Sequence, residues 1–355
     1  MKKNIIQRIK RFQRLPKLHK ASTIRTQLIS RITPLASLSN SLIEKRWDSI
    51  PSDHDLILNQ SRAYTTAAPN VLAGIGHTLA EYNTGLIWAR ETGATYVHYP
   101  LLQPWEEYLN FGYGIPTIVE KNISNLKRFR LPRFESDITS KDFDLISKKM
   151  AYVSREEPIL FLLGDGQNSH KQDSTSEELR SRYWANNAIS QRLDLRKSGL
   201  TNISVHVRRR NATDMNNPAV HDPQSAAYKS RYLANDFFMN ACKCIEQELG
   251  REKTHFNIFS QGKPEDFETF ESLHSVELQL QTDQYETFHN LVLADILIVS
   301  PSSFSFKAGM LCKGKKIARS PWWHAIPTND EWIAVPEGLN TAATFSTISK
   351  GLTTR

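Results

Sequence analysis

Short apolar segments of the chain alternate with longer segments in which apolar residues recur at helical spacing. In the second half, each short β-rich run is followed by such a helical pattern. Strands that alternate with helices in this way are typical of parallel sheets, so five strands with four intervening helices predict a doubly wound sheet. We expect strands at 203–208, 255–260, 276–281, 296–300 and 315–319, and helices at 228–249, from 264, at 284–293 and from 303.

The first half of the chain shows the same alternation in fewer segments. The stretch TGLIWARETGATYVHYP predicts a helix that ends near Gly93 and a strand at 95–99, and EPILFLLGD predicts a strand that stops at Gly164 and Asp165. The polar stretch that follows includes STSEELRSR, a helix start of the capping-box type, which we interpret as a connector between two domains. The predicted division is a basic extension at 1–60, an N-terminal Rossmann-like domain with the connector at 61–180, a C-terminal Rossmann-like domain at 181–340 and a tail at 341–355.

The positive charge of the chain is concentrated near its start. The formal net charge is +8, and ten basic residues precede Glu44, the first acidic one, which leaves 35 basic against 37 acidic residues elsewhere. A protein that coats nucleic acid carries its excess charge on the folded body, so we do not expect nucleic acid as a partner. The first twenty residues place apolar side chains among these cations near helical spacing, which suits either a helix on an anionic membrane surface or a solvated basic extension. These apolar residues are Ile5, Ile6, Ile9 and Phe12.

Targeting signals and cysteine spacing indicate the cell compartment in which the protein is expected. No apolar stretch approaches the ~20 residues that span a bilayer, and the start lacks the apolar core of a secretory signal. Cys242, Cys244 and Cys312 include no CxxC pair, which argues against a disulfide framework and against a cysteine zinc site. We therefore expect a cytoplasmic protein. Peripheral attachment to the inner membrane through the basic extension is an open alternative.

Three consecutive arginines stand where the strand at 203–208 is expected to end, in the stretch SVHVRRRNATDMNN. In doubly wound sheets, ligands bind beyond the carboxyl ends of the strands. A guanidinium offers forked donors that match phosphate oxygens, so Arg208 or Arg209 would suit a diphosphate. His206 shares a sheet face with Arg208 because side chains alternate with a period of two. The alternative is that the arginines pair with surface carboxylates and that His206 is a core histidine.

Two other segments offer phosphate-binding features at helix starts. Gly74 and Gly76 precede a helical pattern in AGIGHTLAEY, which would let a ligand approach backbone N–H groups, although an ordinary tight turn explains them equally well. The stretch ADILIVSPSSFSFKAGML leads from a buried strand into three serines at a helix start, where hydroxyls and amides could bind phosphate oxygens; simple N-capping accounts for part of this pattern. These serines are Ser302, Ser303 and Ser305.

Together, GIGHTLAEYNTGLIWARETGATYVH, HVRRRN and ADILIVSPSSFSFKAGMLCKGKKI occur in an order and at separations that resemble the HxRR-motif fucosyltransferase superfamily. This superfamily includes the α-1,2- and α-1,6-fucosyltransferases and the nodulation-type bacterial enzymes. The resemblance covers roughly residues 68 to 325. It implies a GT-B-like α/β fold with two facing Rossmann-type domains, GDP-fucose as the donor substrate, inversion at the anomeric carbon, and no cofactor or required metal.

The resemblance also implies roles for individual residues. His206 would contact the nucleotide and Arg208 the β-phosphate, with Arg209 beside them. The family commonly has Asp where Asn211 stands, and nodulation-type members look similar to this chain there. The family acid that reads guanine aligns near Thr287, next to Glu286. The remaining donor-binding candidates are Gly74, Gly76, His77, Ser302, Ser303 and Ser305.

The chemistry of transfer agrees with these assignments. Cleavage of the bond to a GDP leaving group develops charge on the β-phosphate, which an arginine and amide donors stabilise without a metal ion. We find no DxD-like acidic pair at a strand end, so no metal site is expected. An inverting transfer needs a general base on the acceptor hydroxyl. Asp214 is the first candidate, with Asp222 and His221 behind it; a solvated loop acid is the alternative for Asp214.

Aromatic residues could form an acceptor-binding wall, because sugars stack on aromatic faces. The stretch QPWEEYLNFGYG holds Trp105, Tyr108, Phe111 and Tyr113, and packing in the core or between domains is an equally good interpretation. We expect Trp105, Tyr108 and Asp222 on the acceptor side. For PWWHAIP, which holds Trp322, Trp323 and His324, we rank packing first because the segment follows the last expected strand.

The sequence therefore predicts an inverting, metal-independent fucosyltransferase that uses GDP-fucose and a glycan acceptor, either an oligosaccharide or a glycolipid, as in polysaccharide biosynthesis. One alternative is a GT-B transferase that uses another nucleotide sugar. The alternative from a different class is a non-catalytic protein that binds sugar nucleotides or glycans. The acceptor and the linkage do not follow from the sequence, because acceptor loops vary freely on such a scaffold.

Overall fold

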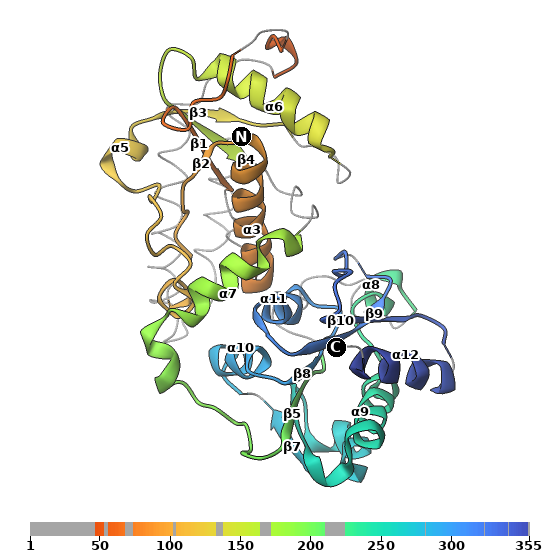
Figure 1. Ribbon diagram of the computed structural model, residues 1–355. Helices are drawn as coiled ribbons and strands as arrows, with labels where there is room; N and C mark the ends of the chain where they lie inside the picture. The colour runs from red at the N-terminus through yellow and green to blue at the C-terminus, as the bar shows by residue number, and fades with distance from the viewer. Residues whose placement is uncertain are drawn as a thin grey trace, which may run out of the picture.

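The computed structural model contains two parallel β-sheets, each with its own helices (Figure 1). We call the part around the first sheet the N-terminal lobe and the part around the second sheet the C-terminal lobe. The predicted fold class, α/β with two parallel sheets, is confirmed. The structure describes residues 47–52, 56–67, 74–101, 104–132, 138–163, 172–209, 224–280, 282–322, 324–339 and 341–353.

The sheet of the N-terminal lobe has the strand order β2-β1-β4-β3, and all of its strand pairs are parallel. Central strand β4 is buried along its whole length, which explains its continuous apolar sequence. The sequence analysis missed β1 and β3 because AYTTA and KRFR carry polar residues in a short run. The strands are β1 (Ala63–Ala67), β2 (Thr95–Tyr96), β3 (Lys127–Arg130) and β4 (Ile159–Leu163).

One helix of the N-terminal lobe, α3 (Ile75–Thr92), contacts the C-terminal lobe. It ends at Gly93, as expected, in a left-handed conformation at φ 78° that glycine adopts readily. Helix α6 (Ser140–Val153) begins with a capping box formed by Thr139 and Asp142. The shorter helices of this lobe and the connector are η1 (Trp47–Ser49), α4 (Trp105–Leu109), α5 (Lys121–Ser124), η2 (Gln172–Thr175), α7 (Ser176–Trp184) and η3 (Asn187–Gln191).

The sheet of the C-terminal lobe has the order β7-β6-β5-β8-β9-β10, again with all pairs parallel. In chain order this is the 3-2-1-4-5-6 arrangement of dinucleotide-binding sheets, and the order reverses between β5 and β8. The sequence analysis found five of these strands and missed β10. The strands are β5 (Thr201–His206), β6 (Thr254–Ser260), β7 (Val276–Leu280), β8 (Ile296–Ile298), β9 (Lys315–Ser320) and β10 (Trp332–Pro336).

Helices cover both faces of this second sheet, as a doubly wound arrangement requires. Along β8, Ile296 and Ile298 belong to one buried apolar cluster and Leu297 belongs to another, because successive side chains point to opposite faces. The first cluster includes α9 (Asn235–Leu249) and α12 (Thr341–Thr353), and the second includes α10 (Gln284–Val292) and α11 (Ser303–Leu311). The remaining helices are α8 (Ala226–Lys229), η5 (Arg251–Lys253) and η6 (Pro264–Ser272).

The end of the chain differs from the expected tail. Residues 341–353 form helix α12, and its Ile348 is fully buried in the same apolar cluster as Phe238 of α9. The helix covers one face of the second sheet and is part of its core. The predicted boundaries at 180 and 340 stay predictions.

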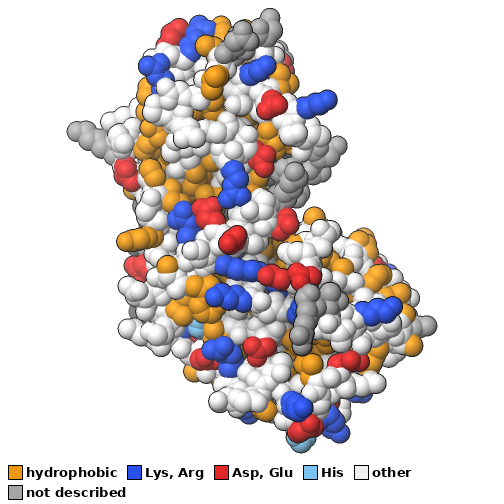
Figure 2. Space-filling model, viewed as in Figure 1, with side chains coloured by type: hydrophobic (Ala, Val, Ile, Leu, Met, Phe, Trp, Pro, Cys, Tyr) orange, Lys and Arg blue, Asp and Glu red, His pale blue; other side chains and the backbone are white. Residues whose placement is uncertain are grey.

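Charged side chains of both signs are interspersed on the face of the molecule that Figure 2 draws. This mixture agrees with the near balance of basic and acidic residues from Glu44 onward.

The two lobes contact each other through α3 and α11, which lie close together in Figure 1. Gly76, in the first turn of α3, packs against the backbone of α11: a Cβ atom at this position would lie 2.4 Å from the backbone nitrogen of Phe304. Leu79 of α3 and Phe306 of α11 belong to one buried apolar cluster. A glycine is therefore required where the starts of the two helices meet.

Candidate functional site

The carboxyl ends of β5 and β8 lie side by side at the point where the strand order of the second sheet reverses. Val205 pairs with Ile298, so the residues that follow each strand leave the sheet at the same edge. Residues 207–209 follow β5, and the turn that follows β8 leads directly into α11. This is the position at which open α/β sheets bind their ligands.

Two serines hold the end of β5 in place. Ser300 Oγ accepts a hydrogen bond from the Arg208 backbone N–H at 2.7 Å and donates one to the His206 carbonyl oxygen at 2.5 Å. From the other neighbouring strand, Ser260 Oγ donates to the Val207 carbonyl oxygen at 2.7 Å. The sequence analysis missed both serines, although each is the polar residue that ends an apolar strand. They fix the backbone from which Arg208 projects.

His206 is half-buried at the end of β5, with its ring 5.6 Å from that of Phe304 in α11. Burial, and then the positive charge of Arg208, lower the pKa of His206 to about 3. The imidazole is therefore neutral at neutral pH and can both donate and accept. Its Nδ1 atom is buried and has no hydrogen-bond partner among the described residues. A ligand could supply that partner.

The structure separates the roles of the arginines. Arg209 is occupied by its own lobe, since its guanidinium donates to the Arg208 carbonyl oxygen at 2.9 Å and to Oδ1 of Asn235 at the start of α9. Burial lowers the pKa of Arg209. The side chain of Arg208 is half-buried, and its guanidinium carbon lies 6.0 Å from the centre of the Tyr232 ring. Arg209 thus anchors the strand end to α9, and Arg208 is the better candidate for a phosphate ligand.

The three serines at the start of α11 also differ. Ser302 is the buried N-cap residue, and no side-chain cap hydrogen bond forms there. Ser305 is fully buried and donates to the carbonyl oxygens of Ser300 at 3.1 Å and Ser302 at 3.3 Å. Ser303 is half-buried, with its Oγ 2.8 Å from Nε2 of His324. Ser305 therefore stabilises the turn, and Ser303 is the serine best placed to meet a ligand.

The start of α3 lies against this same turn of α11. Gly74 is the N-cap residue of α3, and Gly76 packs on Ser303 and Phe304. His77 lies in the first turn with its Nε2 3.3 Å from a carboxylate oxygen of Glu81. The positive ends of two helices therefore meet beside the end of β5, where backbone N–H groups attract an anion.

Several predicted residues lie outside the described residues. These are the candidate bases Asp214, Asp222 and His221, together with Arg210, Asn211 and Trp323. Their roles stay predictions.

Two aromatic residues of the predicted acceptor wall, Trp105 and Tyr108, take part in a packing contact between the lobes. Trp105 is only 5% exposed, and its ring centre lies 4.4 Å from that of Tyr285 in α10. The Tyr108 hydroxyl donates to the Tyr285 carbonyl oxygen at 2.6 Å, and the guanidinium carbon of Arg192 lies 3.6 Å from the centre of its ring. Burial raises the pKa of Tyr108. Trp105 is buried and has no exposed face for a sugar, so we correct its acceptor-binding prediction. Tyr108 is half-buried, and its acceptor-binding role stays a prediction.

Glu286, the candidate guanine-reading residue, lies half-buried in the first turn of α10. Its carbonyl oxygen accepts a hydrogen bond from the Asn290 side chain at 3.0 Å. Phe288 of the same helix contacts Phe304 at 5.4 Å between ring centres, which connects α10 to the start of α11.

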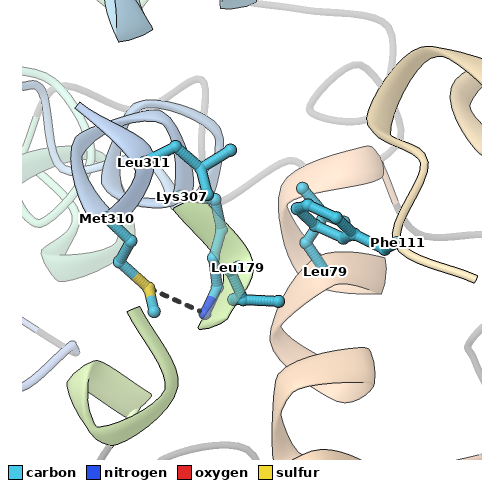
Figure 3. Close-up of a pocket in the computed structure, with 6 residues that line it drawn as sticks. All are labelled: Leu79, Phe111, Leu179, Lys307, Met310 and Leu311. Carbon is cyan, nitrogen blue, oxygen red and sulfur yellow. Dashed lines mark hydrogen bonds between the residues drawn. The ribbon is translucent and has the colours of Figure 1, made fainter. Parts of the chain in front are cut away.

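A small apolar cavity between α3, α7 and α11 contains a buried lysine that the sequence analysis missed (Figure 3). The ammonium group of Lys307 donates to the side-chain oxygen of Gln172 and lies 3.3 Å from the sulfur of Met310. Burial lowers the pKa of Lys307 to about 7. Its neighbours are Leu79, Phe111, Leu179, Met310 and Leu311. With this lining, the cavity is part of the contact between the lobes.

Two further properties concern metals and membranes. Within the described ranges, no group of three or more His, Cys, Asp and Glu side chains is placed to hold a metal ion. None of the described helices is both long and apolar enough to cross a bilayer.

No protein-family model matches the chain, and no curated protein matches its sequence. Among solved structures, POFUT1 in complex with GDP is similar at 12% identity and a TM-score of 0.43, over 79% of this chain and 100% of that one. POFUT1 in complex with GDP-fucose is similar at 12% identity and a TM-score of 0.41, over 82% and 100%. The E. coli heptosyltransferase WaaC with ADP is similar at 8% identity and a TM-score of 0.43, over 81% and 99%. Identities and scores this low identify neither the family nor the substrate of this chain.

Proposed function

We propose that the chain is an inverting, metal-independent glycosyltransferase that transfers fucose from GDP-fucose to an oligosaccharide or glycolipid acceptor. The observation that carries the proposal is the meeting of Arg208, His206 and the N-terminal ends of α3 and α11 at the switch point of the second sheet. The choice of GDP-fucose rests on the resemblance of the three sequence segments to the HxRR-motif fucosyltransferases.

The geometry supports a diphosphate leaving group. As the bond to the sugar breaks, negative charge grows on the β-phosphate, and a guanidinium with helix N–H groups stabilises this charge most when they are held in place beforehand. Ser300 and Ser260 fix the backbone around Arg208, and the glycine contact fixes α3 against α11. The neutral His206 can hydrogen-bond the nucleotide without adding charge.

The acceptor hydroxyl must lose a proton to a base as it attacks the anomeric carbon. We assign this role to Asp214, which follows the arginines in the sequence. The carboxylate takes the acceptor proton, the new glycosidic bond forms with inversion, and GDP leaves with the electrons of the broken bond.

Thermal unfolding in the presence of nucleotides tests the donor. We expect GDP and GDP-fucose to raise the Tm, and this shift should survive EDTA, because ligand binding to the folded state stabilises it. UDP and ADP sugars serve as matched controls. A preference for a UDP sugar with added manganese would contradict the assignment, as would the absence of any shift with a guanine nucleotide.

Asp214→Asn separates an enzyme from a non-catalytic binding protein. Removal of the base should lower transfer and donor hydrolysis by about 10²-fold or more while GDP binding persists. Asp144→Asn, at an exposed position of α6, is the matched control for the loss of an acid that has no proposed role. Unchanged turnover in Asp214→Asn would place the base elsewhere, and wild-type protein that binds GDP-fucose without turnover on any glycan would favour the binding protein.

A further inference from the structure

His324 lies directly behind the start of α11. It follows β9, and its Nε2 is 2.8 Å from Ser303 Oγ. Its ring stacks on that of Phe306 with 4.5 Å between the centres and 8° between the planes. The side chain is 8% exposed, so both its position and its orientation are held by packing. Packing was the role expected from the sequence, and the hydrogen bond to Ser303 adds a second one.

The imidazole of His324 is neutral. Burial is the main cause that lowers its pKa to about 3, and the positive charges of Lys307 and His77 act in the same direction. A neutral imidazole carries a hydrogen on only one of its two nitrogens. Either His324 Nε2 donates to Ser303 Oγ or Ser303 Oγ donates to His324 Nε2. The two cases differ in whether the serine hydroxyl offers its proton or only its lone pairs to the site.

We propose that His324 is a positioning residue that donates from Nε2 to Ser303 Oγ and so directs the Ser303 proton toward the phosphate oxygens of the donor. This inference rests on the proposed function and concerns the same site. It names a residue that no sequence motif assigned to that site and gives it one task, the orientation of a single hydroxyl.

The polarity of the bond follows from the charge of the ligand. A hydroxyl has one donor and two acceptor positions. If Ser303 donated to His324, only its lone pairs would face an incoming anion, next to the N–H groups of the helix start. If it accepts from His324, its proton is available for a phosphate oxygen, and a hydrogen bond to a charged acceptor is stronger than a neutral one. Because Phe306 fixes the ring plane, this arrangement exists before the ligand arrives.

Isothermal titration with GDP, and separately with pyrophosphate, tests the proposal on four variants. His324→Phe keeps an aromatic ring on Phe306 and removes the donor, so we expect GDP affinity to fall about tenfold. His324→Gln can still donate and should recover most of this loss. Ser303→Ala should lose about as much as His324→Phe, and the double variant Ser303→Ala/His324→Phe should lose no more than Ser303→Ala alone, because the histidine acts only through the serine. The same pattern with pyrophosphate places the effect at the phosphates.

His289 provides a matched control for the loss of a buried histidine. Its Nδ1 lies 2.7 Å from the Tyr183 hydroxyl, and burial is the first of the causes that lower its pKa to about 4. His289→Phe removes a comparable bond between α10 and α7, and this bond does not involve Ser303. It should lower the Tm and leave GDP affinity within about twofold of wild type, because lost stability alone is not read out as affinity.

Three outcomes would overturn the inference. The losses in Ser303→Ala and His324→Phe could multiply in the double variant, His324→Phe could bind GDP as wild type does, or His324→Gln could fail to recover any affinity. If one of these outcomes occurs while Arg208→Ala weakens GDP binding in the same experiments, this inference falls and the proposed function stands. If wild-type protein binds neither GDP nor pyrophosphate, both fall together.

Discussion

The polar end of β5 and the aromatic contact between Trp105 and Tyr285 both lie near the junction of the two lobes. The side chains of the two regions differ in their burial and in their hydrogen bonds. At the strand end, hydrogen bonds with Ser300 and Ser260 hold the backbone, and Nδ1 of His206 has no hydrogen-bond partner among the described residues. In the aromatic contact, Trp105 is buried and the Tyr108 hydroxyl donates to the Tyr285 carbonyl oxygen. Residue types typical of ligand sites occur in both regions, so burial and bonding distinguish the site from the packing contact.

The largest effect on stability is expected at the aromatic contact. Trp105→Ala should lower the free energy of unfolding by about 3 to 5 kcal/mol, because it leaves a cavity where a buried indole packs against Tyr285 and Phe288. Denaturant unfolding measures the change. Tyr113→Ala is the control: Tyr113 is 78% exposed, and its loss should change stability by less than about 0.5 kcal/mol. A loss below 1 kcal/mol for Trp105→Ala would break the comparison.

The next largest effect is expected at the strand end, on function. Arg208→Ala should lower kcat/KM for GDP-fucose by about 10²- to 10³-fold, because a donor to the developing charge is lost. Unfolding in denaturant should show little change in stability. Arg208→Lys keeps the charge without the fork and should recover only part of the rate. Equal rates for wild type and Arg208→Ala would remove the basis of the site.

Acid should destabilise both regions, since each contains a buried histidine. His324 and His289 have a pKa of about 3 and about 4 in the folded protein, against about 6.5 when unfolded, so the unfolded chain binds more protons as the pH falls. The stability that their neutral forms contribute is complete above pH ~6.5 and declines below it toward the folded pKa values. At pH 5.5 each histidine should lower the free energy of unfolding by about 1 kcal/mol relative to neutral pH.

Urea unfolding between pH 7.5 and 5.5 measures this loss. His324→Gln and His289→Gln should each make stability less dependent on pH by a similar amount. A pH dependence that neither variant changes would contradict the assignment of neutral imidazoles in the two regions.

The smallest effect sharpens the comparison within the aromatic contact. Tyr108→Phe keeps the ring and removes the hydroxyl that donates to the Tyr285 carbonyl oxygen. Stability should fall by about 1 kcal/mol, measured by denaturant unfolding, and GDP affinity should stay as in wild type. Unchanged stability would contradict the contribution of this hydrogen bond to the aromatic contact.

Much of the C-terminal lobe could be predicted because its pattern is local. The strands that begin at residues 201, 254, 276, 296 and 315 lie close to the expected ranges. Strand β10 was missed because WIAVP is short and ends in a proline, which an edge strand tolerates. Helix α12 was missed because its polar residues hide the single apolar face that packs on α9.

The sequence by itself determined the alternation of strands and helices, and with it the edge of the second sheet at which Arg208 and Ser303 were expected. This follows because the period of side chains along a strand or helix is local, and parallel strands end at one edge. Only the tertiary structure decided which partners the members of each cluster have. Asn235, the partner of Arg209, and His324, the partner of Ser303, lie 26 and 21 positions away along the chain. Contacts over such separations follow from packing, and no local pattern records them.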